Sequence, residues 1–271
     1  TCFGTTGPYG RKLGFDGLAQ AMCGNMHLTG TPEEPMKSYS PWVDFGTASL
    51  CALGAVVALM ARQQTGRGQE VQGALLSTAL TTASPALIEQ AVRAPNRVAT
   101  GNRGQLNAPS DVFATKDGHI MVLVIGQPMY ARWASLLGEE HWLEDERFAT
   151  DDERGEHGEL FSARMAQWCE ERTTKEALSD LDAARVPAGP VYNPQQALDD
   201  THLREAGFFE HLDYPGAPGP APLTTTPVRL LETPGRIRTR APLLGEHTDE
   251  ILGTLGYSAE EIGQMRSARV V

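Results

Sequence analysis

One apolar stretch limits what this chain can fold into more than any other feature. From Leu50 to Ala61 the sequence carries only apolar and small residues, and the next charge is Arg62. A helix needs about 20 apolar residues to cross a bilayer comfortably, and this run is shorter. We therefore expect a helix over residues 44–62 that is buried in a soluble core and ends at a glycine-containing stop, residues 65–68.

The carboxylate before that run is Asp44. It stands at the start of the expected helix, where backbone N–H groups without intrahelical partners and the helix dipole favour a negative charge. This spacing leaves two interpretations open. Asp44 is either a reactive carboxylate or a plain N-cap, because Asp is a preferred capping residue.

The charge balance excludes some classes of partner. A formal net charge of −11 and a pI near 5.1 argue against nucleic acid or an anionic membrane, since both bind basic surfaces. A local basic pocket for a phosphorylated cofactor stays open as a possibility.

The cysteines have no CxxC spacing, so we expect reduced thiols in a cytoplasmic protein, with neither disulfides nor a metal site. No signal peptide or transmembrane stretch is recognisable. The cysteines are Cys2, Cys23, Cys51 and Cys169.

The order of helical and strand patterns predicts an α/β protein. In the first third we expect the end of a strand in residues 1–12, helices at 15–24, 44–62 and 76–92, and a strand at 69–75. This order suggests parallel strands in an α/β layer. After residue 109 the pattern changes to a hairpin with an Asp117-Gly118 turn, followed by helices at 127–137, 141–146, 158–171 and 173–184.

Later signals are turns, caps and short strands. Thr173 or Thr174 with Glu176, and Ser258 with Glu261, form capping patterns, and Asn193 precedes a helix that starts with Pro194. Thr248 is a further candidate cap, and strands are expected at 208–212 and 227–231. The predicted domains are a Rossmann-like large domain in part (1–92), a linker (93–109), a small α+β domain (110–190), a second linker (191–206) and a return to the large domain (207–271).

Five stretches, in this order, resemble the family III CoA-transferases, the group that includes formyl-CoA transferase and the carnitine and bile-acid CoA-transferases. The resemblance runs from end to end of the chain, and its last stretch is the most specific. The stretches are Gly7-Pro-Tyr9 with Gly14-Phe-Asp16 and Gln20; Thr29-Gly-Thr-Pro-Glu-Glu-Pro35; Asp44 with the small-residue helix, Arg62 and Thr65-Gly-Arg-Gly-Gln69; Thr100-Gly-Asn-Arg103 with Pro109 and Lys116-Asp-Gly118; and Arg240-Ala-Pro-Leu-Leu-Gly-Glu-His-Thr248.

The resemblance implies a function and a site. Asp44 matches the family's catalytic aspartate, which attacks an acyl-CoA thioester and forms an acyl-aspartyl anhydride and then an aspartyl-CoA thioester. The implied substrates are an acyl-CoA and a small carboxylic acid, with no metal. The implied assembly is a homodimer of interlocked chains. The implied coenzyme A contacts are Arg11, Lys12, Phe15 and a glycine loop with Gly101, Gly104 and Gln105.

The resemblance also implies a further N-terminal part, with the first βαβ units and part of the coenzyme A site, that this sequence does not contain. We expect that another chain supplies it or that the sequence is a fragment. Arg11 and Lys12 are equally well explained as solvated loop charges, and residues 100–105 as a domain linker. His247 is either a structural residue where a helix begins, which we favour, or a residue that lines the site.

Two other functions stay open. An α-methylacyl-CoA racemase resembles the same pattern but pairs a histidine with the aspartate, and here the matching position is Phe15, which cannot move a proton. The other is a non-catalytic fragment or subunit that assembles with an N-terminal partner.

Overall fold

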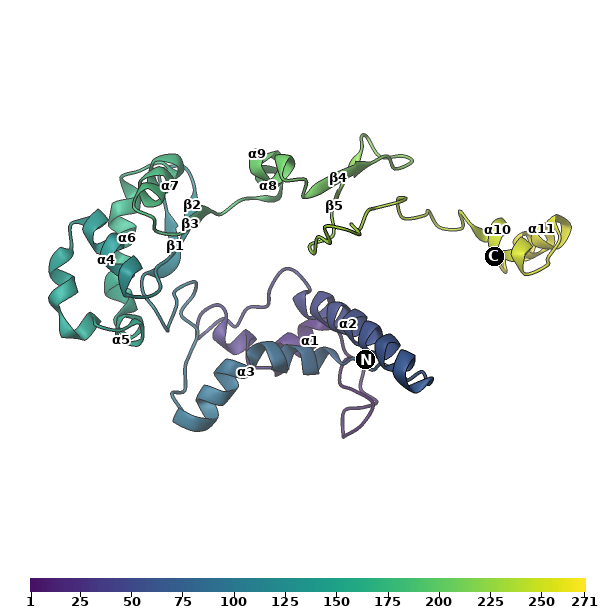
Figure 1. The fold of residues 1–271 in the computed structure, drawn as a ribbon, viewed down its shortest axis with the longest axis horizontal. Helices are drawn as coiled ribbons and strands as arrows, with labels where there is room; N and C mark the ends of the chain where they lie inside the picture. The colour runs from purple at the N-terminus through teal and green to yellow at the C-terminus, as the bar shows by residue number, and fades with distance from the viewer. The chain divides into compact units, whose positions relative to one another are not determined.

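The computed structural model describes all 271 residues, which divide into two compact units, Thr1–Val191 and Tyr192–Val271 (Figure 1). The first unit combines helices with one small sheet, and the second contains short helices and a two-stranded sheet. The elements of the first unit are α1 (Asp16–Met22), η1 (Met26–Leu28), α2 (Trp42–Thr65), α3 (Leu75–Arg93), β1 (Ser110–Ala114), β2 (His119–Leu123), α4 (Gln127–Leu137), η2 (Glu140–Glu144), η3 (Glu146–Phe148), α5 (Asp151–Glu156), α6 (Gly158–Glu170), α7 (Thr174–Ala183) and β3 (Ala188–Pro190).

Helices α1, α2 and α3 pack against one another through small side chains. Thr47 of α2 donates a hydrogen bond from Oγ1 to Thr78 Oγ1 of α3 at 2.7 Å. A Cβ atom at Gly46 would lie 3.2 Å from the Thr78 side chain, so the two helices approach each other closely here. The side chains buried at the centre of this packing are Ala19, Cys23, Val43, Ala79 and Ala83.

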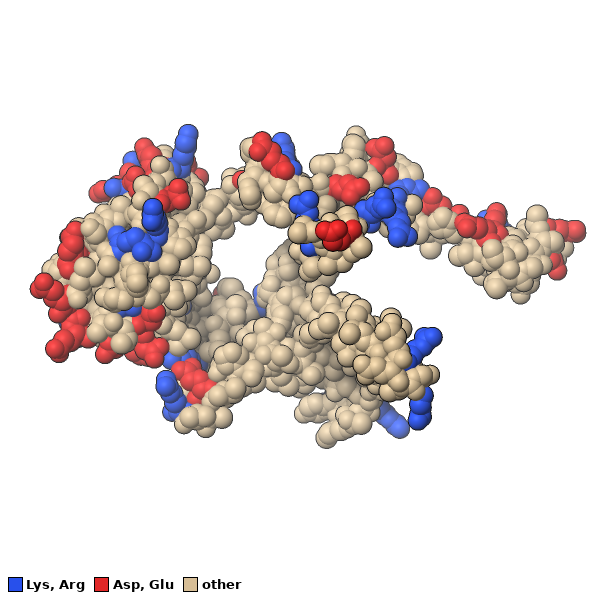
Figure 2. All heavy atoms as spheres, viewed as in Figure 1, with Lys and Arg blue, Asp and Glu red and all other residues tan.

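The outer side of α2 is bare, which contradicts the expected burial. Leu53 and Met60 are 60% and 61% exposed, and only 6% of the helix's most apolar window is buried. The physical reason is the distribution of sizes, because the small residues face α3 and the larger apolar ones face outward. Figure 2 shows a surface over α2 almost free of charge until the end of the helix. By length and composition alone α2 is able to span a membrane, a test that core helices of soluble proteins also pass.

The sheet of the first unit is antiparallel throughout. The strand order is β1-β2-β3, with Phe113 opposite Ile120 and Ile120 opposite Pro190. The predicted hairpin is confirmed, and its turn is closed by a hydrogen bond from Thr115 N–H to Gly118 O. The prediction of parallel strands is wrong for the described chain, because both sheets pair antiparallel. Residues 1–12, 69–75 and 227–231, expected to contain strand, form none.

An aromatic core lies between this sheet and helices α4 and α6. Trp133, Tyr130 and Phe161 are fully buried and meet at ring distances of 5.8–6.1 Å. Ile120 and Val122 of β2 pack into the same core. Burial raises the pKa of the Tyr130 hydroxyl to about 12. The large rings and the β-branched strand residues account for the compactness of this part.

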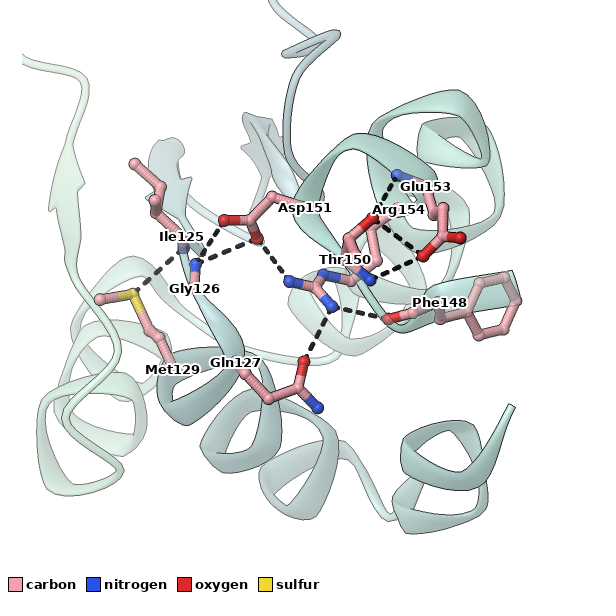
Figure 3. Close-up of polar contacts among 9 residues, drawn as sticks. All are labelled: Ile125, Gly126, Gln127, Met129, Phe148, Thr150, Asp151, Glu153 and Arg154. Carbon is pink, nitrogen blue, oxygen red and sulfur yellow. Dashed lines mark hydrogen bonds and ion pairs between the residues drawn. The ribbon is translucent and has the colours of Figure 1, made fainter. Parts of the chain in front are cut away.

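A buried arginine ties the segments around that core together (Figure 3). Arg154 is 1% exposed, pairs with Asp151, and donates from Nη1 to Gln127 Oε1 at 3.0 Å and to Phe148 O at 2.6 Å. Asp151 in turn accepts from the N–H of Gly126, which precedes α4. One guanidinium thus fixes the start of α4 and the start of α5.

The second unit is built from short elements whose starts the sequence predicts well. Asn193 and Ser258 form full capping boxes, as Thr173 does in the first unit. Thr248 is the first helical residue rather than the cap, and His247 occupies the N-cap position with Nδ1 3.1 Å from Glu250 Oε2. The elements are α8 (Pro194–Asp199), α9 (Thr201–Glu205), β4 (Phe209–Leu212), β5 (Ala221–Thr224), α10 (Thr248–Thr254) and α11 (Ala259–Ser267).

Candidate active site

Asp44 is the third residue of α2, and its side chain is exposed. Its carboxylate forms no hydrogen bond or ion pair with the rest of the chain, whereas its backbone N–H is bonded. The N-cap position belongs to Pro41, which has no side-chain acceptor. The alternative that Asp44 is a plain N-cap is therefore wrong. The residue is an unpartnered carboxylate at the positive end of a helix dipole.

Pro41 explains why this carboxylate stays unpartnered. In a capping box the carboxylate at the third helical position accepts a hydrogen bond from the backbone N–H of the N-cap residue. Proline has no N–H, so Asp44 cannot fold back in this way. Four other helices of the chain do form the box, and their third residue is held by it. These pairs are Thr150 with Glu153, Thr173 with Glu176, Asn193 with Gln196, and Ser258 with Glu261.

The first turn of α2 is capped from another helix. Asp16, the first residue of α1, is buried, and its Oδ2 accepts from the N–H of Val43 at 2.8 Å and of Asp44 at 3.1 Å. Its Oδ1 accepts from Gln20 Nε2, and Gln20 Oε1 accepts from the N–H of Ser38 at 3.0 Å. The chain before α2, its first turn and α1 are thus joined by one buried network.

Cys2 lies beside this network. Its Sγ is 3.8 Å from Phe15 O, and the residue is buried. Burial is the largest cause that raises the pKa of the Cys2 thiol; the positive α-amino group opposes it, and the negative charge of Asp44 raises it further. The charge of Asp44 therefore has a small electrostatic effect on the Cys2 thiol.

The predicted coenzyme A residues near the beginning of the chain lie in one exposed loop. Phe15 is the N-cap of α1 and is 81% exposed, directly before Asp16. Arg11 and Lys12 are exposed, and the Lys12 ammonium lies 4.1 Å from the centre of the Tyr9 ring. The structure therefore brings Phe15 next to the network behind Asp44, and it shows no contact of Arg11 or Lys12 with Asp44.

The predicted glycine loop is anchored. Gly101 has a positive φ of 68° and donates its N–H to Gly30 O at 2.7 Å. Gly104 donates to Ser110 O at 2.6 Å, and Gln105 Nε2 donates to Val98 O at 2.7 Å. In this conformation the two glycine N–H groups are already bonded, so neither is available to an oxyanion. None of the three residues contacts Asp44.

The chain contains an apolar cavity elsewhere in the first unit. A volume of about 430 Å³ lies between the end of α1, the middle of α3 and residues 95–98. Cys23, Leu28 and Leu87 line it, and the Arg97–Glu89 ion pair closes one side. Asp44 does not line this cavity. No group of three His, Cys, Asp or Glu side chains is placed to hold a metal ion.

The sequence profile of CoA-transferase family III matches residues 1–248 of this chain. The chain belongs to this family. The match includes Asp44, the Asp16 network and the Gly245-Glu246-His247-Thr248 stretch.

Several curated enzymes are similar across the chain. It is 31% identical over 272 residues to the succinyl-CoA–D-citramalate CoA-transferase of Chloroflexus aurantiacus, covering 99% of this chain and 67% of that enzyme. It is 28% identical over 261 residues to the succinate–glutarate CoA-transferase of Agrobacterium fabrum, covering 94% and 64%. It is 29% identical over 287 residues to a formyl-CoA:oxalate CoA-transferase of Rhodopseudomonas palustris, covering 97% and 67%. The chain thus spans about two thirds of the length of these family III relatives.

Solved structures share the fold. A CAIB/BAIF family protein from Brucella suis matches with a TM-score of 0.76 and 27% identity, over 94% of this chain and 66% of that one. Rv3272 from Mycobacterium tuberculosis matches with a TM-score of 0.75 and 23% identity, over 91% and 66%. The mixed α/β arrangement described above is therefore one that this family III chain shares with CAIB/BAIF structures.

The sequence reasoning missed three residues of the site, namely Cys2, Asp16 as a hydrogen-bonding group, and Pro41. The signal for Asp16 was present. Asp16 and Gln20 stand one helical turn apart, and the helix that begins after Pro41 has no side chain of its own to cap it.

Proposed function

We propose that this family III chain carries the acyl-transfer centre of a CoA-transferase, with Asp44 as the nucleophile. The observation that carries the proposal is the free, exposed Asp44 carboxylate on the first turn of α2. A carboxylate that binds backbone N–H groups has its charge stabilised, as the lowered pKa values of Glu176 and Glu261 in their capping boxes illustrate. Asp44 has no such bond, so its lone pairs are available for attack.

The proposed reaction proceeds by exchange of acyl groups. An Asp44 oxygen attacks the thioester carbonyl carbon, the C–S bond breaks, and the CoA thiolate leaves with an acyl-aspartyl anhydride on the enzyme. The thiolate then attacks the Asp44 carbonyl carbon and releases the first acid as a carboxylate. The acceptor carboxylate attacks the Asp44 carbonyl carbon of the resulting aspartyl-CoA thioester, the C–S bond breaks, and a second anhydride forms as the CoA thiolate leaves. The thiolate finally attacks the acceptor's carbonyl carbon in this anhydride, which gives the acceptor acyl-CoA and releases the Asp44 carboxylate. Covalent catalysis divides one difficult exchange into easier steps.

The names of the relatives suggest the substrates. Several similar enzymes are named for succinyl-CoA, and the acids in their names, such as citramalate, malate, mesaconate and glutarate, are dicarboxylic. We therefore propose succinyl-CoA as the donor and a small dicarboxylic acid as the acceptor. Arg11, Lys12, Phe15, Gly101, Gly104 and Gln105 remain the proposed coenzyme A contacts. A Rossmann-like large domain, an interlocked homodimer and a cytoplasmic location belong to the same proposal.

A racemase function has less support. Proton exchange at the carbon next to the thioester needs a second acid–base group opposite Asp44. Phe15 supplies none, and the neighbouring Asp16 carboxylate is buried and holds three N–H groups. The other titratable side chains bonded to this network are Lys37, which donates to Ser38 O at 3.4 Å, and Cys23, which donates to Gln20 O at 3.3 Å.

Trapping of the covalent intermediate tests the proposal. The protein, expressed from its complete native gene, is incubated with succinyl-CoA and hydroxylamine and digested with trypsin. Cleavage after Lys37 and Arg62 releases a peptide in which Asp44 is the only carboxylate side chain. A hydroxamate on this peptide assigns the reaction to Asp44 without further sequencing.

Two variants control the experiment. Asp44→Asn should give no adduct. Glu260→Gln, which changes an exposed carboxylate in the first turn of α11, should give the wild-type amount. Absence of an adduct from succinyl-CoA and from a panel of short acyl-CoA thioesters would reject the transferase function and favour the racemase or a non-catalytic subunit.

A further inference from the structure

The first turn of α2 depends on a group outside the helix. The N–H groups at the start of a helix have no intrahelical partners and are usually satisfied by the N-cap side chain. Pro41 has no such side chain, and the N–H groups of Val43 and Asp44 donate to Asp16 instead. The cap of α2 is therefore supplied from α1, 27 and 28 residues away in sequence.

Asp16 is itself held in place. The residue is 8% exposed, and Gln20, which donates to its second oxygen, is 3% exposed. Gln20 also accepts from the N–H of Ser38, in the segment that leads into α2. Both oxygens of Asp16 are thus used, so the carboxylate has one orientation. Loss of the Asp16 carboxylate would leave the N–H groups that donate to it without an acceptor, and unsatisfied buried donors are unfavourable.

Asp16 holds the backbone of Asp44 but not its side-chain carboxylate. It takes the backbone N–H of Asp44, so the peptide at this position is fixed to the buried side of the turn. The Asp44 side chain is exposed and its carboxylate has no bond to the rest of the chain. The reactive group is therefore presented from a rigid point.

We propose that Asp16 is a positioning residue for the nucleophile: by capping α2 from α1, it fixes the Asp44 backbone and keeps the Asp44 carboxylate directed outward. This inference rests on the proposed function. Asp16 does not touch the substrate. We expect Asp16 to affect the rate at which Asp44 attacks bound acyl-CoA, because small errors in the placement of reacting groups reduce rates steeply.

Asp16→Asn is the informative change. The asparagine keeps the size of the side chain but has a single acceptor oxygen, so it cannot serve both the helix N–H groups and Gln20. We expect the rate of hydroxamate formation at saturating succinyl-CoA to fall about ten- to hundredfold. The KM for succinyl-CoA should stay within about twofold, since loss of an interaction that acts after binding leaves KM unchanged.

The readout independent of activity is amide hydrogen exchange at Val43 and Asp44. Their protection should fall in Asp16→Asn, whereas protection in α4 and α6 should not. Gln20→Met, which leaves Asp16 in place but removes its support, provides a milder second variant in case Asp16→Asn unfolds. Asp117→Asn is the matched control. Asp117 also accepts a backbone N–H from a helix outside its own segment, that of Thr174 at 2.7 Å, and its loss should leave trapping at Asp44 unchanged.

The outcomes are distinct. Reduced protection with reduced trapping in either variant supports the proposal. Reduced protection with wild-type trapping overturns the positioning role and leaves the proposed function intact. An equal loss of trapping in Asp117→Asn also overturns it, because the effect would then be a general consequence of removing a cap. If wild-type protein gives no adduct while Val43 and Asp44 are protected, the proposed function fails, the positioning role of Asp16 fails with it, and the capping of α2 by Asp16 stands.

Discussion

Pro41 and Asp44 occupy the N-cap and third positions of α2, the two positions that a capping box joins. In four other helices of the chain both bonds of the box form. In α2 the proline removes the donor, and the carboxylate at the third position is left unbonded. The capping box that stabilises the four other helices is therefore absent at the proposed nucleophile.

Pro41→Ser should give the Asp44 carboxylate a hydrogen-bond donor and reduce the reaction. The new backbone N–H would bond that carboxylate, so we expect hydroxamate trapping to fall about tenfold. The free energy of unfolding should hardly change, because one added hydrogen bond, about 0.5–1.5 kcal/mol, offsets the lost rigidity of proline, about 0.4–1 kcal/mol. Trapping rates and urea unfolding measure the two effects, and Ser40→Ala is the neighbouring control. Full activity of Pro41→Ser would contradict the account of a free carboxylate.

The thiol of Cys2 should report the charge of Asp44. Burial raises the Cys2 pKa first, and the Asp44 charge adds to it, so Asp44→Asn should lower that pKa. Only the thiolate is alkylated, and at a fixed pH below the pKa the rate of Cys2 alkylation by iodoacetamide should therefore rise. Cys169, whose pKa burial raises to about 12, is an internal control and should react as slowly as before. An unchanged Cys2 rate would mean that the charge of Asp44 does not influence the thiol.

Loss of the buried arginine should destabilise the first unit strongly. Arg154→Met leaves Asp151 and the carbonyl of Phe148 without their partner, and we expect a decrease of about 3–5 kcal/mol in the free energy of unfolding. Arg147→Met removes an ion pair of similar geometry to Asp145, but its side chain is 67% exposed, and here we expect less than about 1 kcal/mol. Denaturant unfolding compares the two, and equal losses would show that burial is not the reason.

Acid should weaken the Arg240-to-Glu246 segment of the second unit. The Arg240 hydrogen bonds, and then the N–H of Leu243, lower the Glu246 pKa from 4.5 to about 2. A carboxyl group with a lowered folded pKa stabilises above its unfolded pKa, so this contribution is present above pH 4.5 and is lost as the pH falls toward 2. Exchange protection of the Leu243 amide should fall over this range. Glu246→Gln should abolish this pH dependence, and Glu232→Gln should leave it unchanged. If the pH dependence of Leu243 protection persists in Glu246→Gln, Glu246 is not its cause.

The parts of the fold that could be predicted from the sequence are those fixed by neighbouring residues. The capping boxes at Thr173, Asn193 and Ser258 and the hairpin turn at Asp117-Gly118 each depend on residues within a few positions. Residues 69–75 do not form the expected strand, because no neighbouring strand pairs with them. The segment's neighbours are the carbonyls of Thr1 and Cys2, which accept the N–H groups of Leu75 and Leu76 without forming a ladder.

For the site, too, only the features that depend on neighbouring residues could be predicted from the sequence. Asp44 was identified from its place before an apolar run and from a family resemblance, and both depend on contiguous sequence. The role of Asp16 arises from a contact between two helices, and the exposure of α2 arises from which of its sides α3 covers. Neither is encoded in the spacing of one segment. The contacts proposed for Arg11, Lys12, Phe15 and the glycine loop stay predictions.

The bare outer side of helix α2 has a consequence for solubility. Its 24 residues make a rod about 36 Å long at 1.5 Å per residue, pinned at the first turn by Asp16 and bare along most of its length. The end that carries Asp44 is held by α1 and by the Thr47–Thr78 hydrogen bond to α3. Apolar surface as extensive as that on the outer side of α2 favours aggregation in water. Polar substitutions there should therefore raise the solubility of the protein.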